Sequence, residues 1–266
     1  MATQGEFYKE VNLDSGSFRY GSVNKPTFYF NTFMDDMDYL NVGKVIVPTT
    51  YYVFTSAYTS CTINNVAVSW PQGNYTPAEW ITTIGGLYPA LGITITYSPI
   101  TNKLTFTGLA AFTIVFGASE LASTYLGFTT GTFSSSGNSI VSPNVVQMSG
   151  PNYLILHARI ASVFNDNSIY FTPTQALGVA ESRDKMCIIP ITENRNSVMV
   201  YDMVLDHFFE WLDTSTRNIE FYFTLGTRQE VVDFNGSTFQ IKLTGYSYNG
   251  GLSASRQNQN QKASSR

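Results

Sequence analysis

Alternating hydrophobic and polar positions predict extended strands in several parts of the chain. The clearest is Ile219 to Leu225, where hydrophobic residues fill every second position and polar residues such as Glu220 stand between them. Tyr153 to Ala161 alternates in the same way, with one wholly apolar side and one amphipathic side that carries His157 and Arg159. Because successive side chains of a strand point to opposite faces, each segment is expected to cover a hydrophobic core with one face.

Runs rich in β-branched and aromatic residues predict further strands. These runs are Thr27 to Phe33, Val42 to Phe54, Cys61 to Trp70, Ile93 to Tyr97, Lys103 to Thr107, Phe112 to Phe116, Met186 to Ile191 and Ser197 to Tyr201. The pair Asn235-Gly236, between Val231 to Phe234 and Thr238 to Leu243, predicts a tight β-hairpin because Asn-Gly readily adopts positive φ angles.

One helix has a well-defined predicted start. Thr76 can cap it, Pro77 suits its first position, and Glu79 stands three residues after the cap, as a capping box requires. Gly85-Gly86 is expected to end this helix early. Met203 to Asp213 fits both a helical and an extended pattern, and we interpret it as irregular or partly helical.

Composition divides the chain into five parts. Residues 1–25 are polar and glycine-punctuated and are expected to form an N-terminal arm. Residues 26–133 hold strands and the helix-hairpin unit, 134–149 form a Ser/Gly-rich linker or loop, and 150–248 hold the second group of strands. The tail, 249–266, has the composition of a flexible segment and is expected to be a docking arm that orders on contact.

Charge is scarce in this chain. Charged residues make up 13% of the 266 residues, against about 25% in an average soluble domain, while aromatic residues reach 15%. A surface so poor in charge predicts that neighbouring molecules cover much of it. The net charge of −4 gives no general attraction to phosphate, so we expect no nucleic-acid binding by the body of the protein. No run approaches the roughly 20 apolar residues that a membrane-spanning helix needs.

Candidate catalytic residues are few, and each is explained by an ordinary structural role. His157 is expected to be an ordinary hydrogen-bonded strand histidine, since it belongs to no recognisable constellation. Asp206-His207 could be paired with Cys187 as a nucleophile, but Cys187 precedes Ile188-Ile189 in what reads as a core strand. Cys61 and Cys187 are expected to be buried thiols, with a disulfide left open as the alternative.

Two groups of acidic residues are candidate sites, the first for a metal ion and the second for glycoside hydrolysis by paired carboxylates. Asp35-Asp36-Met37-Asp38 lacks the glycine and distal glutamate of a calcium loop, so we interpret it as a solvated turn. The second group alternates in sign and is interpreted as a surface or intersubunit loop. It consists of Glu181, Arg183, Asp184, Lys185, Glu193 and Arg195. The sequence therefore predicts no catalytic residue, no cofactor and no metal.

Several segments resemble the jelly-roll minor capsid (penton-type) proteins of virophages and polinton-like DNA viruses. In the second half these are Gly150-Pro-Asn-Tyr-Leu-Ile-Leu-His, Met186-Cys-Ile-Ile-Pro-Ile-Thr, Ile219-Glu-Phe-Tyr-Phe-Thr-Leu and Val232-Asp-Phe-Asn-Gly-Ser-Thr-Phe-Gln-Ile-Lys-Leu. In the first half they are Gly73-Asn-Tyr-Thr-Pro-Ala-Glu-Trp, Ile93-Thr-Ile-Thr-Tyr, Thr101-Asn-Lys-Leu-Thr-Phe and Leu126-Gly-Phe.

The resemblance implies a mainly β protein, an antiparallel jelly-roll sandwich with a small α+β insertion or second domain. It implies a virion structural protein, assembled inside the host cell as a homo-oligomer, expected to be a pentamer, beside a neighbouring major capsid protein. Subunit contacts are expected from the tail, through Arg256, Lys262 and Arg266. The alternative is a carbohydrate-binding or attachment β-sandwich, and an enzyme is the least favoured class because no titratable pair has motif spacing.

Overall fold

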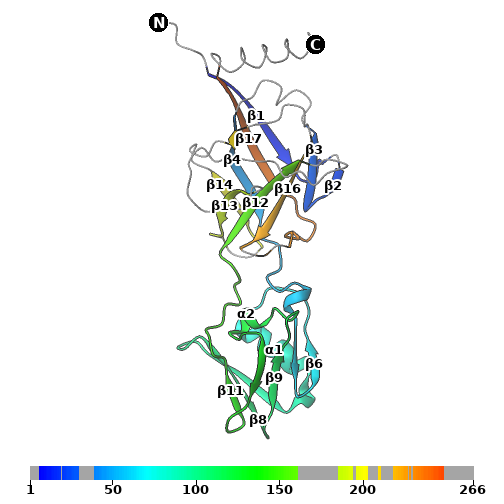
Figure 1. The fold of residues 1–266 in the computed structure, drawn as a ribbon, viewed down its shortest axis with the longest axis vertical. Coiled ribbons are helices and arrows are strands. Elements are labelled where there is room, and N and C mark those ends of the chain that lie inside the picture. The colour runs from blue at the N-terminus through cyan, green and yellow to red at the C-terminus, as the bar shows by residue number, and fades with distance from the viewer. Residues whose placement is uncertain are drawn as a thin grey trace, which may run out of the picture. The chain divides into compact units, whose positions relative to one another are not determined.

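The computed structural model describes residues 6–18, 20–29, 39–160, 185–193, 196–202, 209–210, 218–226, 228 and 230–248. The chain divides into two compact units, whose strands and helices are labelled in Figure 1. The first unit, Met1–Tyr51 with Asn152–Arg266, is called the jelly-roll unit below, and the second, Tyr52–Pro151, is called the inserted unit. The inserted unit thus interrupts the sequence of the first.

The jelly-roll unit contains two antiparallel sheets. The first has the strand order β1 (Glu6–Asp14), β17 (Gln240–Tyr248), β4 (Tyr39–Pro48), β14 (Val198–Asp202), and β15 (Phe209–Glu210) also pairs with β4. The second has the order β13 (Lys185–Pro190), β12 (Tyr153–Ile160), β16 (Asn218–Leu225), β3 (Lys25–Tyr29), β2 (Tyr20–Ser22).

The strand order identifies the fold. Eight strands of these sheets follow one another along the chain as β1, β3, β4, β12, β13, β14, β16 and β17. Numbered one to eight in that sequence, the sheets read 1-8-3-6 and 5-4-7-2, so each sheet takes strands from both ends of the chain. This arrangement is that of a jelly roll, which confirms the predicted fold class. The inserted unit lies in the connection between β4 and β12.

Alternation along the strands builds the core of the jelly-roll unit. Ile219, Phe221 and Phe223 on β16 are fully buried, as the pattern predicted. Phe223 lies 4.9 Å from Phe239, measured between ring centroids, in an edge-on arrangement that aromatic pairs favour. A register shift at Gly43 in β4 lets Val42 and Val45, three positions apart, both face the core.

The inserted unit has its own two sheets. One has the order β10 (Gly131–Ser134), β9 (Thr113–Phe116), β5 (Ser60–Ile63), β6 (Val66–Ser69), and the other β11 (Ser139–Val141), β8 (Lys103–Gly108), β7 (Ile93–Ser98). Its helices are α1 (Pro77–Leu87) and α2 (Ser123–Leu126), with short 3₁₀ turns at Ser56–Tyr58 and Pro89–Leu91.

The inserted unit also has its own core, built largely from aromatic rings. Trp80 lies 5.4 Å from Trp70 and 6.4 Å from Phe106, measured between ring centroids. The chain enters and leaves this unit at neighbouring points, because a Cβ atom on Gly150 would lie 2.7 Å from Val53 Cγ1. Gly150 has a φ of 72°, a conformation that favours glycine.

The predicted helix forms, with one difference at its end. Thr76 and Glu79 make the capping box, and the buried side chains of α1 are Trp80 and Ile84. The helix continues through the two glycines to Leu87, so the expectation that they end it was wrong. The amide of Tyr88 still donates to the carbonyl of Ile84, which closes the last turn.

Three further expectations differ from the structure. Residues 6–14, expected in an arm, form β1, because β17 offers a nine-residue partner and Leu13 enters the core. Residues 134–149, expected as a linker or loop, contain the strand β11 and the buried side chains of Val146 and Met148. Asn235 and Gly236 adopt the predicted positive φ angles, but β17 pairs with β1 and β4 instead of forming the predicted hairpin.

Candidate functional site

The strand register gathers five side chains on the outward face of the second sheet. Arg159 on β12 stands opposite Glu220 on β16, and His157 stands opposite Tyr222. Alternation turns all four away from the core, because Ala158 and Phe221 between them point inward. Lys25 on the adjoining strand β3 completes the group, which is called the polar cluster below.

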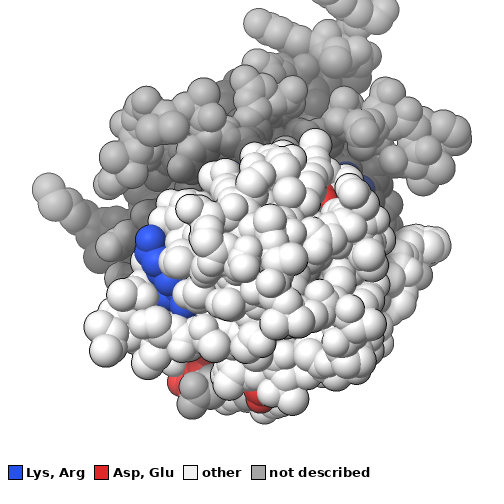
Figure 2. Space-filling view, turned by 90° about the horizontal axis from the view of Figure 1, so that it is seen from below, with Lys and Arg blue, Asp and Glu red and all other residues white. Residues whose placement is uncertain are grey.

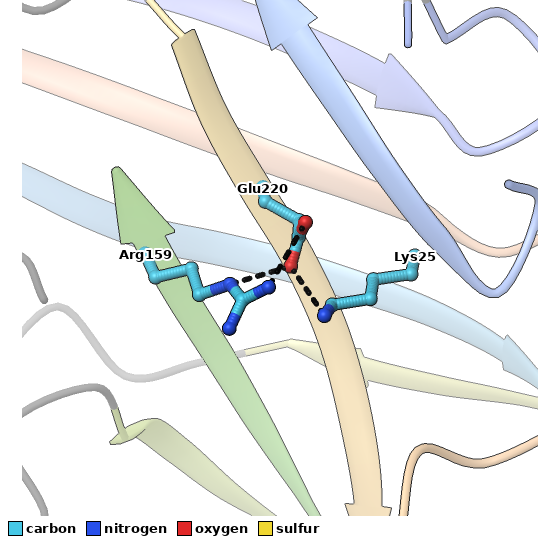
Figure 3. Close-up of polar contacts among 3 residues, drawn as sticks. All are labelled: Lys25, Arg159 and Glu220. Carbon is cyan, nitrogen blue, oxygen red and sulfur yellow. Dashed lines mark hydrogen bonds and ion pairs between the residues drawn. The ribbon is translucent and has the colours of Figure 1, made fainter. Parts of the chain in front are cut away.

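Glu220 is the centre of the polar cluster (Figure 3). Arg159 donates from Nε to Glu220 Oε1 at 2.7 Å and from Nη2 to Oε2 at 3.4 Å. Lys25 Nζ lies 3.1 Å from the same Oε1, and the Glu220 side chain is only 12% exposed. The two-pronged arginine contact fixes geometry as well as charge, so the carboxylate ties three neighbouring strands together.

The ring of Tyr222 contacts the other three ring or cationic side chains of the polar cluster, Lys25, Arg159 and His157. Lys25 Nζ lies 5.4 Å from the centroid of its ring and Arg159 Cζ lies 5.8 Å from it, within the range of cation–π attraction. The imidazole of His157 stacks on Tyr222 at 4.7 Å between centroids, with the planes 3° apart. His157 Nε2 also shares a hydrogen bond of 2.9 Å with Thr224 Oγ1.

These contacts describe a cluster that holds strands together. The expectation that His157 is a hydrogen-bonded strand histidine is confirmed. His157 and Thr224 are buried, which separates the imidazole and the hydroxyl from any substrate in solution. Both carboxylate oxygens of Glu220 are bonded by cations, Oε1 by Arg159 and Lys25 and Oε2 by Arg159.

The two cysteines are free and buried. Burial raises the pKa of the Cys61 thiol to about 12, with the nearby Glu120 carboxylate adding to the effect. Burial likewise raises the pKa of Cys187 to about 12, against a smaller lowering by a backbone hydrogen bond of Leu156. A thiol that stays protonated near neutral pH is a poor nucleophile, so Cys187 has the properties of a core residue.

Most of the other candidate site residues lie outside the described part of the chain. Glu193 is exposed, and Lys185 begins β13. The remaining candidates lie outside the described residues: Asp35, Asp36, Asp38, Glu181, Arg183, Asp184, Arg195, Asp206, His207, Arg256, Lys262 and Arg266. Within the described part of the chain, no three His, Cys, Asp or Glu side chains cluster as metal ligands would. None of the helices described there is long and apolar enough to span a bilayer.

The surface of the inserted unit is almost uncharged. Its 100 residues, Tyr52–Pro151, include only three charged side chains, Glu79, Lys103 and Glu120. All three bond within the unit: Glu79 in the capping box, Lys103 Nζ to the carbonyl of Pro143 at 2.9 Å, and Glu120 Oε2 to the amide of Gly117 at 2.6 Å. Figure 2 shows a face of this unit on which white, uncharged residues predominate.

Hydrophobic side chains stand on this uncharged surface. Ile100 and Leu109 are more than nine-tenths exposed. Further exposed apolar or tyrosine side chains of the inserted unit are Tyr52, Val66, Leu87, Leu121, Val141 and Val145. Exposed hydrophobic groups with so little charge around them are typical of surfaces that meet other proteins.

Sequence reasoning missed the polar cluster as a unit. It recognised that His157 and Arg159 share one face of a strand, and that Glu220 and Tyr222 share one face of another. It did not reveal that the two strands pair in the register that matches Arg159 with Glu220. Lys25 was assigned to the end of an arm, whereas it begins β3.

Comparison with known proteins gives limited similarity. No protein-family model matches the chain, and no curated protein matches it in sequence. Among solved structures, the chain is similar to the crystal structure of selenomethionine-labelled mavirus penton protein, with a TM-score of 0.45 and 8% sequence identity. That alignment covers 92% of this chain and 99% of the other. The jelly-roll assignment rests on the strand order given above.

Proposed function

We propose that this protein is a structural subunit of a virion, a minor capsid protein of the penton type that works through contacts between subunits. The observation that carries the proposal is a jelly roll interrupted by an inserted unit with only three charged residues. Jelly rolls occur in viral capsids, lectins and cupins, so the surface must discriminate among these classes.

The surface favours a role in assembly. An isolated soluble protein normally carries many charged side chains that keep it apart from its neighbours, and the inserted unit has only three. Large exposed residues such as Ile100 and Leu109 add apolar area that water disfavours and that a neighbouring subunit would cover. The polar cluster supports the same role, because it fixes the register of three strands without exposing a reactive group.

The expected assembly is a closed ring of five copies at an icosahedral vertex, beside a major capsid protein, in a virion assembled inside the host cell. Size-exclusion chromatography with light scattering, followed by electron microscopy of the eluted species, tests this proposal. The expected result is a ring of five-fold symmetry that persists at high salt, because few ion pairs are available for its contacts. A compact monomer at every protein concentration would overturn it.

A carbohydrate-binding sandwich is the second class and has less support. Such sites commonly present a tryptophan or tyrosine platform to the sugar. Trp70 and Trp80 are both buried in the core of the inserted unit and cannot serve as one. Binding to a neutral glycan on an array, abolished by Tyr52→Ala, would reverse this preference.

A further inference from the structure

Edge strands of a sheet expose backbone groups that another chain can pair with. In the jelly-roll unit, within the part of the chain that the structure describes, β1 and β14 flank the first sheet and β13 and β2 flank the second. β14 has β4 as its one strand partner there. Figure 1 shows β14 at the side of the sheet away from β1.

Three of these edges carry features that discourage a further strand. β1 has the charged residues Glu6, Lys9, Glu10 and Asp14, and Glu10 pairs with Lys242 at 2.8 Å. β2 is three residues long and contains Gly21 at a φ of 97°. β13 begins with Lys185 and ends with Pro190, and its register with β12 is interrupted. Charge, shortness, irregularity and proline all protect an edge.

β14 has no such protection over its first four residues. Val198 and Val200 point outward and are 56% and 55% exposed, while Met199 between them is buried in the core. Ile46 stands opposite Val200 on β4 and extends the apolar surface. The strand then ends in Asp202, which lies 3.3 Å from Lys44 and is 72% exposed. The outward-facing residues of β14 are therefore two valines, Val198 and Val200, followed by the acidic Asp202.

The C-terminal tail contains the complementary pattern. Leu252, Ala254 and Arg256 occupy every second position, with Ser253 and Ser255 between them. In a parallel pairing, Leu252 would lie beside Val198, Ala254 beside Val200, and Arg256 beside Asp202. Two apolar contacts and one pair of opposite charges then fall on the same face. The serines between them would lie on the opposite face.

The tail of the same chain cannot reach this position. Ile46 pairs with both Val200 and Gln240, so Val198 is level with residue 238, which is 248 − 238 = 10 residues before the end of β17. Ten strand residues span about 33 Å. From Tyr248 to Leu252 the chain has four residue steps, which extend over at most about 14 Å. A tail paired in this register must therefore come from another copy.

We infer that residues 252–256 of a neighbouring copy add as a parallel strand to the edge of β14 that no described strand occupies. This exchange of arms deepens the proposed function, on which it rests, by naming one contact between subunits. It joins two different surfaces, an edge and a tail, and such a contact can close into a ring. It also assigns a partner, Asp202, to Arg256, one of the three tail residues predicted to make subunit contacts.

A mixed cysteine experiment tests the arm exchange in the full-length protein. Val200→Cys copies and Ala254→Cys copies are prepared separately, mixed and oxidised. Adjacent strands lie about 4.8 Å apart, within the range of Cα separations that a disulfide spans. The expected result is a cross-linked dimer from the mixture and none from either variant alone. Cys61 and Cys187 are buried and do not interfere.

The matched control is Val141→Cys, which places a thiol on an equally exposed edge valine, 52% exposed, of the inserted unit. Equal cross-linking of Ala254→Cys to this control would overturn the inference, as would an oligomer that forms without the predicted cross-link. That second result would leave the proposed function standing, whereas a monomeric wild-type protein would remove both.

A second variant gives a reading that does not depend on cysteine. Val200→Lys places a charge on the edge and is expected to weaken association roughly tenfold or more, while Val141→Lys leaves it unchanged. Circular dichroism and the melting temperature show whether each variant is folded. Unchanged association of folded Val200→Lys protein would contradict the arm exchange.

Discussion

Removing the Trp80 indole tests whether the inserted unit is an independent folding unit. The side chain is 2% exposed and packs edge-on against Trp70 and Phe106. Truncation of a buried tryptophan to alanine costs about 3–5 kcal/mol. Trp80 Nε1 has no hydrogen-bond partner among the described residues, so the change removes packing without breaking a hydrogen bond, and we expect the lower half of that range.

The expected shift can be worked out from the size of the unit. The inserted unit has 100 residues, for which each kcal/mol moves the melting temperature by about 4–8 °C. Trp80→Ala, at about 3–4 kcal/mol, should therefore lower the melting temperature of the inserted unit by about 12–32 °C. The melting temperature of the jelly-roll unit should stay where it is, because the two cores share no residue.

Differential scanning calorimetry of the full chain distinguishes the two units. Phe223→Ala is the matched variant in the other core, where Phe223 is fully buried against Phe234 and Phe239. Each variant should move one transition and leave the other in place. A single transition that both variants shift by the same amount would refute the reasoning, because it would mean that the two units unfold together.

Three further predictions concern smaller features. Glu220→Gln leaves Arg159 without its carboxylate partner and should lower the unfolding free energy of the jelly-roll unit by about 1–3 kcal/mol. Urea denaturation measures this change. An unchanged urea midpoint would contradict a stabilising role of the polar cluster. Thr76→Ala removes the cap of α1 and should cost about 1 kcal/mol, seen only in the transition of the inserted unit. Burial raises the pKa of Cys61 and Cys187 to about 12, so above pH about 8.5 the unfolded chain releases thiol protons that the folded chain keeps. Stability should therefore fall as pH rises from about 8.5 toward 12, and native thiols should resist alkylation at pH 8.

Local sequence signals predicted the elements that depend on local physics. The alternation of Ile219 to Leu225 identified β16 and its buried face, since a half-buried strand needs only its own period of two. The capping box of Thr76 and Glu79 located the start of α1 within one residue, because its hydrogen bonds join neighbours in sequence.

Pairing between distant segments was beyond such signals. β1 looked like an arm because half of its residues are polar, and only the match with β17, more than 200 residues later, makes it a strand. The Asn235-Gly236 turn formed as predicted, but the strand after it found its partners in β1 and β4. A turn motif fixes local dihedral angles and leaves the choice of partner to the rest of the fold.

In the candidate site, too, local sequence predicts the face that each residue takes but not the partner that it meets. The outward positions of His157, Arg159, Glu220 and Tyr222 follow from the alternation of their own strands. That Arg159 meets Glu220 depends on the register of β12 with β16, and that Lys25 joins them depends on the pairing of β16 with β3. Hydrophobic patterning sets which face a residue takes, and it does not specify the neighbour across the sheet.

The close approach of Val53 and Gly150 makes the inserted unit an exchangeable cassette. An insertion whose two ends lie close together can be replaced by another domain, provided that the termini of the replacement are equally close. The inserted unit can accumulate substitutions at its own pace while the jelly roll keeps its strand register. A foreign domain with adjacent termini could be grafted at the same insertion site, between Tyr51 and Asn152.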